Sequence, residues 1–358
     1  MSAALPAPVE RAPGAWIVSP GYDTAFFTAS LLVPLTLWLG FSAGVLTGIA
    51  VYVLFQLLFN LPHNFQTWTM SVLDEGDRKK HGRRYLLAAV VCLAVLGVPM
   101  ALSPDGVYPW VRDALIYWGY YHLVRQHYGF LRLYERKMGD VPAKESRFYA
   151  RYVDAICYLP LLVRFRDPEL MTIRVGAVDA WIHHPVLPES AWVPILALWV
   201  AFVVAAVAHH LHLWRKGRRG LMPRALLLIS VTLAFGLAVL VVQDIIVGIA
   251  VVTAYHNLQY LGLTWFHNRN RAAEPAEGDA SNSTIGWLRG GKVWLYLLFT
   301  MFYGVVIFAP RALIQGQRLA ELPLAFVVAM HYYVDSRMWQ FPLYPERGRW
   351  LRLSRPRA

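Results

Sequence analysis

The sequence is poor in cysteine and in charged residues, and each shortage excludes a class of protein. Only two cysteines, Cys92 and Cys157, occur among the 358 residues, so there is no disulfide framework and no CxxC pair for structural zinc or an iron–sulfur cluster. Charged residues make up 16% of the chain, against roughly 25% in soluble domains. A Walker A motif, a GxGxxG motif and a serine in a nucleophile-elbow context are also missing, which argues against nucleotide enzymes and triad hydrolases.

Apolar residues are abundant instead. They make up 57% of the chain, and the mean hydropathy is +0.40. An apolar run of about 20 residues crosses a bilayer as a helix, so the predicted fold class is all-α, a polytopic transmembrane helical bundle of about ten spans. The ten apolar segments are 24–41, 43–62, 85–103, 108–131, 148–163, 191–213, 224–243, 245–266, 293–310 and 319–340. We expect a cytoplasmic tail over 1–23, one transmembrane domain over 24–340 and a basic cytoplasmic tail over 341–358.

The basic residues predict the orientation of these spans. With ten spans and both termini inside, the inner loops and the C-terminal tail hold 25 Lys and Arg, against six in the outer loops. Positive residues accumulate in cytoplasmic loops, so this asymmetry supports ten spans, including the short fifth one. The net charge of +12 is therefore explained by topology and not by nucleic-acid binding. The expected location is a membrane, the bacterial inner membrane, with both termini cytoplasmic.

Histidines inside the apolar segments are the main functional signal. An ionisable ring in hydrocarbon is costly, so such a residue indicates a functional site, whereas a single one is often satisfied by a neighbouring carbonyl. Neutral imidazole is the commonest metal ligand among side chains. The five histidines are His63, His122, His127, His256 and His331. They fall on spans two, four, eight and ten, all of which run from outside to inside, so facing helices could hold one metal at a similar depth.

The spacing of neighbouring residues adds partners to these ligands. His331 and Asp335 are four apart and share a helix face, as do His256 and Tyr260, with Gln259 one residue earlier. Such outer partners fix ring orientation and tautomer. We expect Asp335, Tyr260, Gln126 and Gln259 to orient ligands or to position oxygen.

Span four contains two histidines that are candidates for the same metal-ligand position. His122 and His127 are five apart, so both can reach one metal only if a π-bulge intervenes, which Gly129 would ease. Otherwise one is a ligand and the other a partner, and the sequence favours His127. A structural ion pair between Arg125 and Asp335 is an alternative role for that carboxylate.

Four short patches resemble a known family. LPHN at 61–64, HYG at 127–129, YH at 255–256 and HxxxD at His331–Asp335 occur in the same order as in the Brp/Blh-type membrane β-carotene dioxygenases. The resemblance implies a polytopic fold whose histidines hold one iron. The positions that match the family's motifs imply His63, His127, His256 and His331 as the iron ligands. The chain departs from the family at Tyr260, which stands where a second histidine is expected, at Thr67 in place of an aspartate, and at Arg132 in place of an acidic residue.

The leading hypothesis is a membrane-bound, metal-dependent oxidoreductase. A set of imidazoles without thiolates suits iron, copper or zinc, and we expect iron, mononuclear or dinuclear. The partners would be a lipophilic substrate such as a carotenoid, isoprenoid or lipid, O2, and an electron-donor protein of unknown kind. The dinuclear, desaturase-like variant lacks its HxxxH and HxxHH boxes. The alternatives are a proton- or ion-coupled transporter that uses the His and Asp residues as a relay, and a haem protein with two axial histidines.

Overall fold

The computed structural model describes residues 15–139, 141–175, 178–273, 293–314 and 318–353. These residues are mostly helical. The helices are α1 (Pro20–Asp23), α2 (Leu32–Ser42), α3 (Gly48–Phe55), α4 (Leu61–Met70), α5 (Glu75–Leu102), α6 (Tyr108–Met138), α7 (Ala143–Arg164), α8 (Trp192–Arg215), α9 (Leu221–Phe235), α10 (Ile245–Ala273), α12 (Val293–Leu313), α13 (Leu322–Met338) and α14 (Pro345–Trp350). One antiparallel hairpin, β1 (Thr172–Val175) with β2 (Val178–Trp181), follows α7.

Within the described residues, six helical stretches are long and apolar enough to cross a membrane. They are Pro20–Ser42, Glu75–Leu102, Glu189–Arg215, Leu221–Val241, Ile245–Ala273 and Val293–Leu313. Each of the other predicted segments also coincides with helix, in α3 to α4, α6, α7 and α13. The predicted α-helical class is therefore observed, together with helices that are fit to cross a membrane, whereas the count of ten spans stays a prediction.

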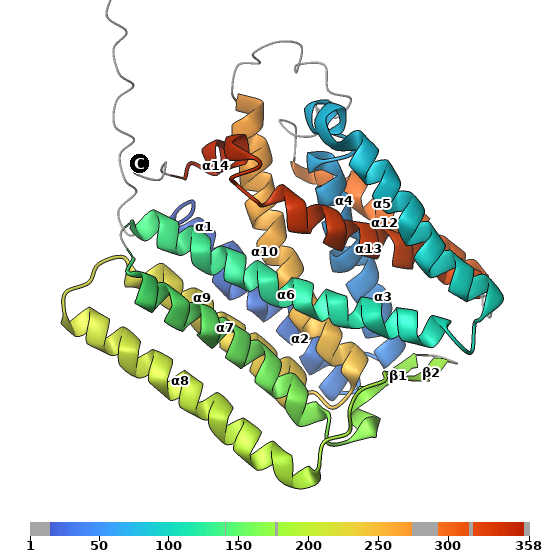
Figure 1. The fold of residues 1–358 in the computed structure, drawn as a ribbon, viewed down its shortest axis with the longest axis horizontal. Coiled ribbons are helices and arrows are strands. Elements are labelled where there is room, and N and C mark those ends of the chain that lie inside the picture. The colour runs from blue at the N-terminus through green and yellow to red at the C-terminus, as the bar shows by residue number, and fades with distance from the viewer. Residues whose placement is uncertain (1–14, 140, 176–177, 274–292, 315–317, 354–358) are drawn as a thin grey trace, which may run out of the picture.

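Helix α10 lies at the centre of the bundle and α8 at its edge (Figure 1). The most apolar 18-residue stretch of α10 is 78% buried inside the protein, whereas the corresponding stretch at α8 is 6% buried. α10 packs against α2, α3, α4 and α6, while α8 packs mainly along α7. A central helix can present side chains on several faces to its neighbours, which makes α10 a suitable support for an internal site.

Three π-helical segments interrupt the α-helices among the described residues, namely η1 (Thr24–Thr28), η3 (Gln56–Asn60) and η6 (Gly236–Val241). A π-bulge adds a residue to one turn and is frequent near functional sites. The cause at η3 is local: Pro62 has no N–H to donate, and its ring crowds the carbonyl four residues earlier, at Leu58. The chain widens there and enters α4 directly before His63.

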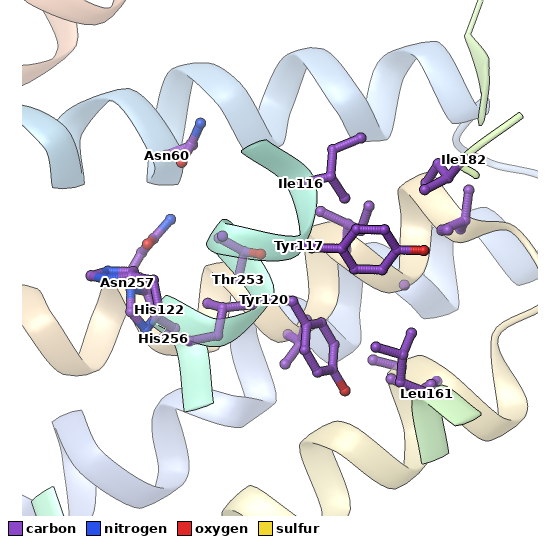
Figure 2. A pocket seen from close by; sticks show the side chains of 18 of the residues that line it. Asn60, Ile116, Tyr117, Tyr120, His122, Leu161, Ile182, Thr253, His256 and Asn257 are labelled. Carbon is purple, nitrogen blue, oxygen red and sulfur yellow. The ribbon is translucent and has the colours of Figure 1, made fainter. Parts of the chain in front are cut away.

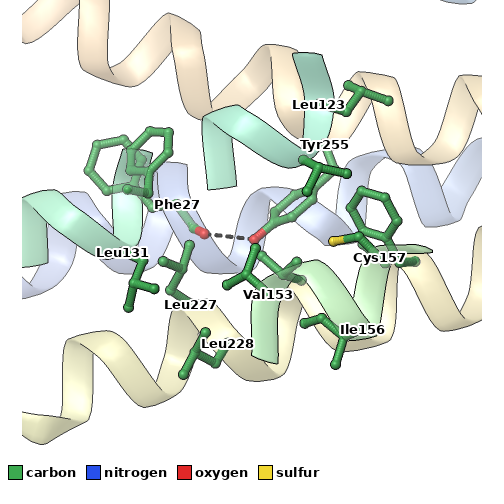
Figure 3. Close-up of a cluster of buried hydrophobic side chains, with 14 of the residues drawn as sticks. Phe27, Leu123, Leu131, Val153, Ile156, Cys157, Leu227, Leu228 and Tyr255 are labelled. Carbon is green, nitrogen blue, oxygen red and sulfur yellow. Dashed lines mark hydrogen bonds between the residues drawn. The ribbon is translucent and has the colours of Figure 1, made fainter. Parts of the chain in front are cut away.

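The largest apolar core joins α6, α7, α9 and α10 with η1 (Figure 3). Leu131, Val153 and Leu227 are buried there around the side chain of Tyr255. The Tyr255 hydroxyl donates to the Phe27 carbonyl at 2.9 Å. Because η1 leaves regular α-helical bonding, this hydrogen bond satisfies one of its buried carbonyls.

Helix α10 approaches η1 too closely for a side chain at Gly262. A Cβ there would lie 2.6 Å from Phe26 Cβ. We expect Gly262→Ala to lower the free energy of unfolding by about 1–3 kcal/mol, because packed side chains must move. Thermal unfolding in detergent measures this. Gly129 in α6 has open space around it, so Gly129→Ala is the control and should be neutral or slightly stabilising. Equal unfolding midpoints for the two variants would contradict the prediction.

The C-terminal segment is anchored to the bundle. Arg347 of α14 is only 3% exposed, and its guanidinium donates to the Met70 carbonyl and to Asp77 Oδ1, both at 3.0 Å. The stretch predicted as a tail from 341 therefore includes a docked helix. Most of the predicted N-terminal tail, residues 1–14, lies outside the described residues.

Candidate metal centre

Four histidines from four helices meet inside the bundle. They are His63 of α4, His122 of α6, His256 of α10 and His331 of α13, and one ligand nitrogen of each lies within 4.8 Å of the others. All four are buried. Their distance along the chain is large, so only the assembled bundle brings them together.

Three of the spacings between the imidazole nitrogens are close to those around one metal ion. The Nε2 atoms of His63 and His331 are 2.8 Å apart, those of His63 and His256 are 3.2 Å apart, and those of His331 and His122 are 3.2 Å apart. A metal–nitrogen bond of about 2.1 Å places neighbouring ligand nitrogens roughly 3.0–3.4 Å apart. Imidazole lone pairs aimed at a common centre repel one another unless a cation or proton lies between them, so this arrangement can hold a metal ion.

A hydrogen-bonded chain of side chains supports His331 from behind. Its Nδ1 lies 2.7 Å from the Thr67 hydroxyl, which lies 3.1 Å from the Tyr260 hydroxyl. Tyr260 in turn donates to Asp335 Oδ1 at 2.6 Å, and the Trp339 indole N–H donates to the same oxygen at 2.9 Å. When Nδ1 of His331 donates to Thr67, Nε2 presents its lone pair to the centre, which is the tautomer that a metal ligand needs.

Asp335 lies at the edge of the centre rather than in a distant ion pair. Its Oδ2 is 3.8 Å from His122 Nε2, and its side chain is buried with that of His122. The expected alternative tie to Arg125 is not what the structure shows, because the Arg125 guanidinium lies over the Tyr128 ring, 4.0 Å from its centroid. Asp335 thus accepts a hydrogen bond from the Tyr260 hydroxyl and lies beside the His122 ring.

His127 is the point at which the structure differs from the expected ligand set. α6 is a regular α-helix from Tyr108 to Met138, so His122 and His127 point in different directions, about 140° apart. His122 joins the four, while the His127 ring stacks on Tyr255 with centroids 5.7 Å apart, and 6.4 Å from the His256 ring. The π-bulge that would bring both to one metal is absent from the described α6. The HYG patch therefore contributes packing, and His122 supplies the imidazole of this helix.

The two predicted glutamines both donate to backbone carbonyls. Gln126 donates through Nε2 to the backbone carbonyl of His256 at 2.9 Å, which ties α6 to α10 beside the centre. Gln259 donates to the Phe27 carbonyl at 2.9 Å. Tyr260, by contrast, lies next to the centre, with its ring centroid 4.4 Å from that of His63.

An apolar cavity of about 180 Å³ opens from the histidines. His63, His122, His256 and His331 line one end together with Asn60 and Asn257, and the lining continues past Tyr117, Tyr120 and Leu161 to Ile182 beside the β-hairpin (Figure 2). Tyr332 also lines it, and its ring stacks on His122 with centroids 4.8 Å apart. Gly119 leaves room for this tyrosine, since a Cβ there would lie 2.6 Å from the Tyr332 hydroxyl.

The sequence did not assign a role to Thr67 or Asn257, and it placed Tyr332 only among the aromatic residues that could line an apolar tunnel, where the structure finds it. Thr67 stood out only as a departure from a family motif, and its position four residues after His63 gave no hint of its contact with His331, 264 residues away. Tyr332 and Asn257 directly follow His331 and His256 in the sequence. That adjacency is the signal that could have found them.

Thr67→Val tests the support behind His331. Valine keeps the shape of threonine and removes the hydroxyl, so His331 Nδ1 loses its partner at 2.7 Å. We expect metal affinity to fall about 10–100-fold, the usual effect of removing an outer hydrogen-bond partner. Competition of the purified protein with a graded series of chelators measures this. Thr67→Ser retains the hydroxyl and should keep the wild-type affinity, and an unchanged affinity in Thr67→Val would show that Thr67 does not orient the ligand.

No family model, no curated protein and no solved structure matches this chain. The fold and the site define its class: a helical protein whose described part has six helices fit to cross a membrane and a buried cluster of four histidines that could bind a metal ion.

Proposed function

We propose that the protein is an integral membrane, metal-dependent oxygenase or oxidase, with non-haem iron, that acts on a lipophilic substrate. The observation that supports it most is the convergence of four imidazoles at the end of an apolar cavity. Imidazole ligands suit iron, and iron bound there would supply the one-electron and O2 chemistry that side chains lack. Ten spans with both termini on the cytoplasmic side of the bacterial inner membrane complete the proposal.

The residues of the chain would position the substrate and keep water away. Cavity-lining side chains such as Leu123, Ile249 and Val252 offer an apolar surface to a long carbon chain, and a dry cavity prevents side reactions of reactive intermediates. Asp335, Tyr260 and Thr67 would hold the His331 tautomer. Tyr332 would fix the plane of His122 by stacking on it.

The geometry favours one metal ion over the two alternatives for the cofactor. Haem needs space for its macrocycle between two axial imidazoles, whereas His63 Nε2 and His331 Nε2 are only 2.8 Å apart. The carboxylate-rich dinuclear centres of helical bundles use several Glu ligands, whereas Asp335 is the carboxylate found beside His122; a histidine-rich dinuclear centre needs more imidazoles than the four that meet here. Four imidazoles with this single acidic neighbour suit a mononuclear centre.

Metal analysis combined with oxygen uptake tests the proposal. Purified wild-type protein should contain about one transition-metal ion per chain, and the iron form should consume O2 when lipid or isoprenoid extracts of the membrane are added. Elemental analysis and an oxygen electrode measure the two quantities, and mass spectrometry of the extract identifies the oxidised product. A preparation that folds but contains no stoichiometric transition metal would overturn the proposal.

A further inference from the structure

The polar groups at the far end of the cavity are already engaged within the protein. The Tyr117 hydroxyl donates to the His183 carbonyl at 2.9 Å, and the Tyr120 hydroxyl donates to the Cys157 carbonyl at 2.5 Å. The Arg164 guanidinium, which is 4% exposed, donates to backbone carbonyls, including that of Val242 at 2.8 Å. These groups have no need of a ligand, so this end of the cavity suits an apolar chain.

The end of the cavity that the histidines line is different, because it contains an amide side chain without a hydrogen-bond partner. Asn257 is 3% exposed, and neither its Oδ1 nor its Nδ2 has a hydrogen-bond partner within the described part of the chain. It lines the cavity at the same end as His122, His256 and Asn60 (Figure 2). Buried amides nearly always have partners, so an unpaired one on a cavity wall indicates a binding group for a ligand or a water.

We infer that Asn257 binds an oxygen atom of the substrate beside the four histidines. The inference rests on the proposed function, in which the cavity holds that substrate. An amide donates through Nδ2 and accepts through Oδ1, so it recognises either a carbonyl or a hydroxyl group. The substrate class is an oxygenated lipophile, such as a lipid or isoprenoid alcohol, aldehyde or ketone, and not a pure hydrocarbon.

This contact would also decide which carbon atom reacts. The oxygen function is held next to His256, the neighbour of Asn257 in α10, while the apolar remainder extends toward Ile182. Fixing a substrate at one polar point aligns the adjacent carbon with the centre and removes the freedom to slide along the cavity. A site built to hydrogen-bond its substrate discriminates against the analogue that lacks the polar group.

Two probes that differ only in a carbonyl group test the inference. Binding of octane and 2-octanone to the full-length protein in detergent is measured by calorimetry for wild type, Asn257→Leu and Asn268→Leu. Asn268 is a buried asparagine of the same helix outside the cavity lining. Each probe is compared between variants, so its partition into detergent cancels. We expect Asn257→Leu to bind 2-octanone about five-fold more weakly than the other two proteins, with octane bound equally by all three. Equal 2-octanone affinities would overturn the inference and leave water as the occupant of the amide.

A second measurement needs no variant and serves if Asn257→Leu does not fold. The infrared carbonyl band of bound 2-octanone should lie below its position in alkane solution, because Nδ2 of Asn257 donates to it; an alkane-like band would refute the contact. Metal content of the same preparations separates this inference from the proposed function. If the protein contains stoichiometric metal but wild type and Asn257→Leu bind 2-octanone equally, only the oxygen-binding role of Asn257 is ruled out. If Asn257→Leu binds 2-octanone more weakly but the protein contains no metal, the oxygenase proposal is ruled out.

Discussion

His256→Ala is expected to reduce the transition-metal content of the purified protein from about one ion per chain to nearly none. His256 is 1% exposed, and its Nε2 lies 3.2 Å from that of His63, so alanine removes one wall of the four-imidazole centre. The loss of a ligand should exceed the roughly 10–100-fold loss of affinity that accompanies removal of an outer partner. Elemental analysis after dialysis against a weak chelator measures the retained metal.

His127→Ala is the matched control for this prediction. His127 is also a buried histidine of the bundle, yet it stacks on Tyr255 and lies outside the four. The control should retain the wild-type metal content while losing stability, because a buried ring is replaced by a cavity. If the two variants retained equal amounts of metal, the centre could not be the one formed by His63, His122, His256 and His331.

Glu145→Gln is expected to have the largest effect on stability. Glu145 at the start of α7 accepts from Arg224 at the start of α9 at 2.8 Å, and the Arg224 side chain is fully buried. The guanidinium also lies over the Tyr149 ring, 4.0 Å from its centroid. Removing the carboxylate leaves a buried positive charge without its counter-charge, which costs about 3–5 kcal/mol of unfolding free energy. Reversible unfolding in mixed micelles measures this difference.

Glu169→Gln provides the comparison. Glu169 pairs with Arg174, and both side chains are largely exposed to solvent. Exposed ion pairs contribute little because water already solvates both charges, so this variant should unfold like the wild type. Equal stabilities of Glu145→Gln and Glu169→Gln would show that water reaches Arg224 and that the α7–α9 contact does not depend on the pair.

The apolar segments predicted most of the helices because membrane-length runs of apolar residues have few alternatives to helix. The segments 108–131 and 245–266, for example, fall within α6 and α10. The β-hairpin at Thr172–Trp181 was not predicted, since its strands contain four residues each and lie among prolines and charged residues. Short strands depend on tertiary contacts more than on their own sequence.

The sequence could predict only those features of the site that follow from the residues and spacing within a single segment. His63, His256 and His331 stood out because each is an ionisable ring in an apolar helix. The choice between His122 and His127 depended on whether α6 contains a π-bulge, and the structure resolves this in favour of a regular helix. Thr67 and Asn257 acquire their roles from packing between helices, which no spacing within one segment reveals.

The four histidines are spread along the chain from α4 to α13, and this has a consequence for biosynthesis. Translation and insertion must reach residue 331 before the fourth imidazole exists. A metal ion therefore cannot be held by the full set until the helices from α4 to α13 have been made and have packed against one another. Under the proposed function, iron would be acquired as a late step of maturation, and occupancy of the centre would mark a correctly assembled molecule.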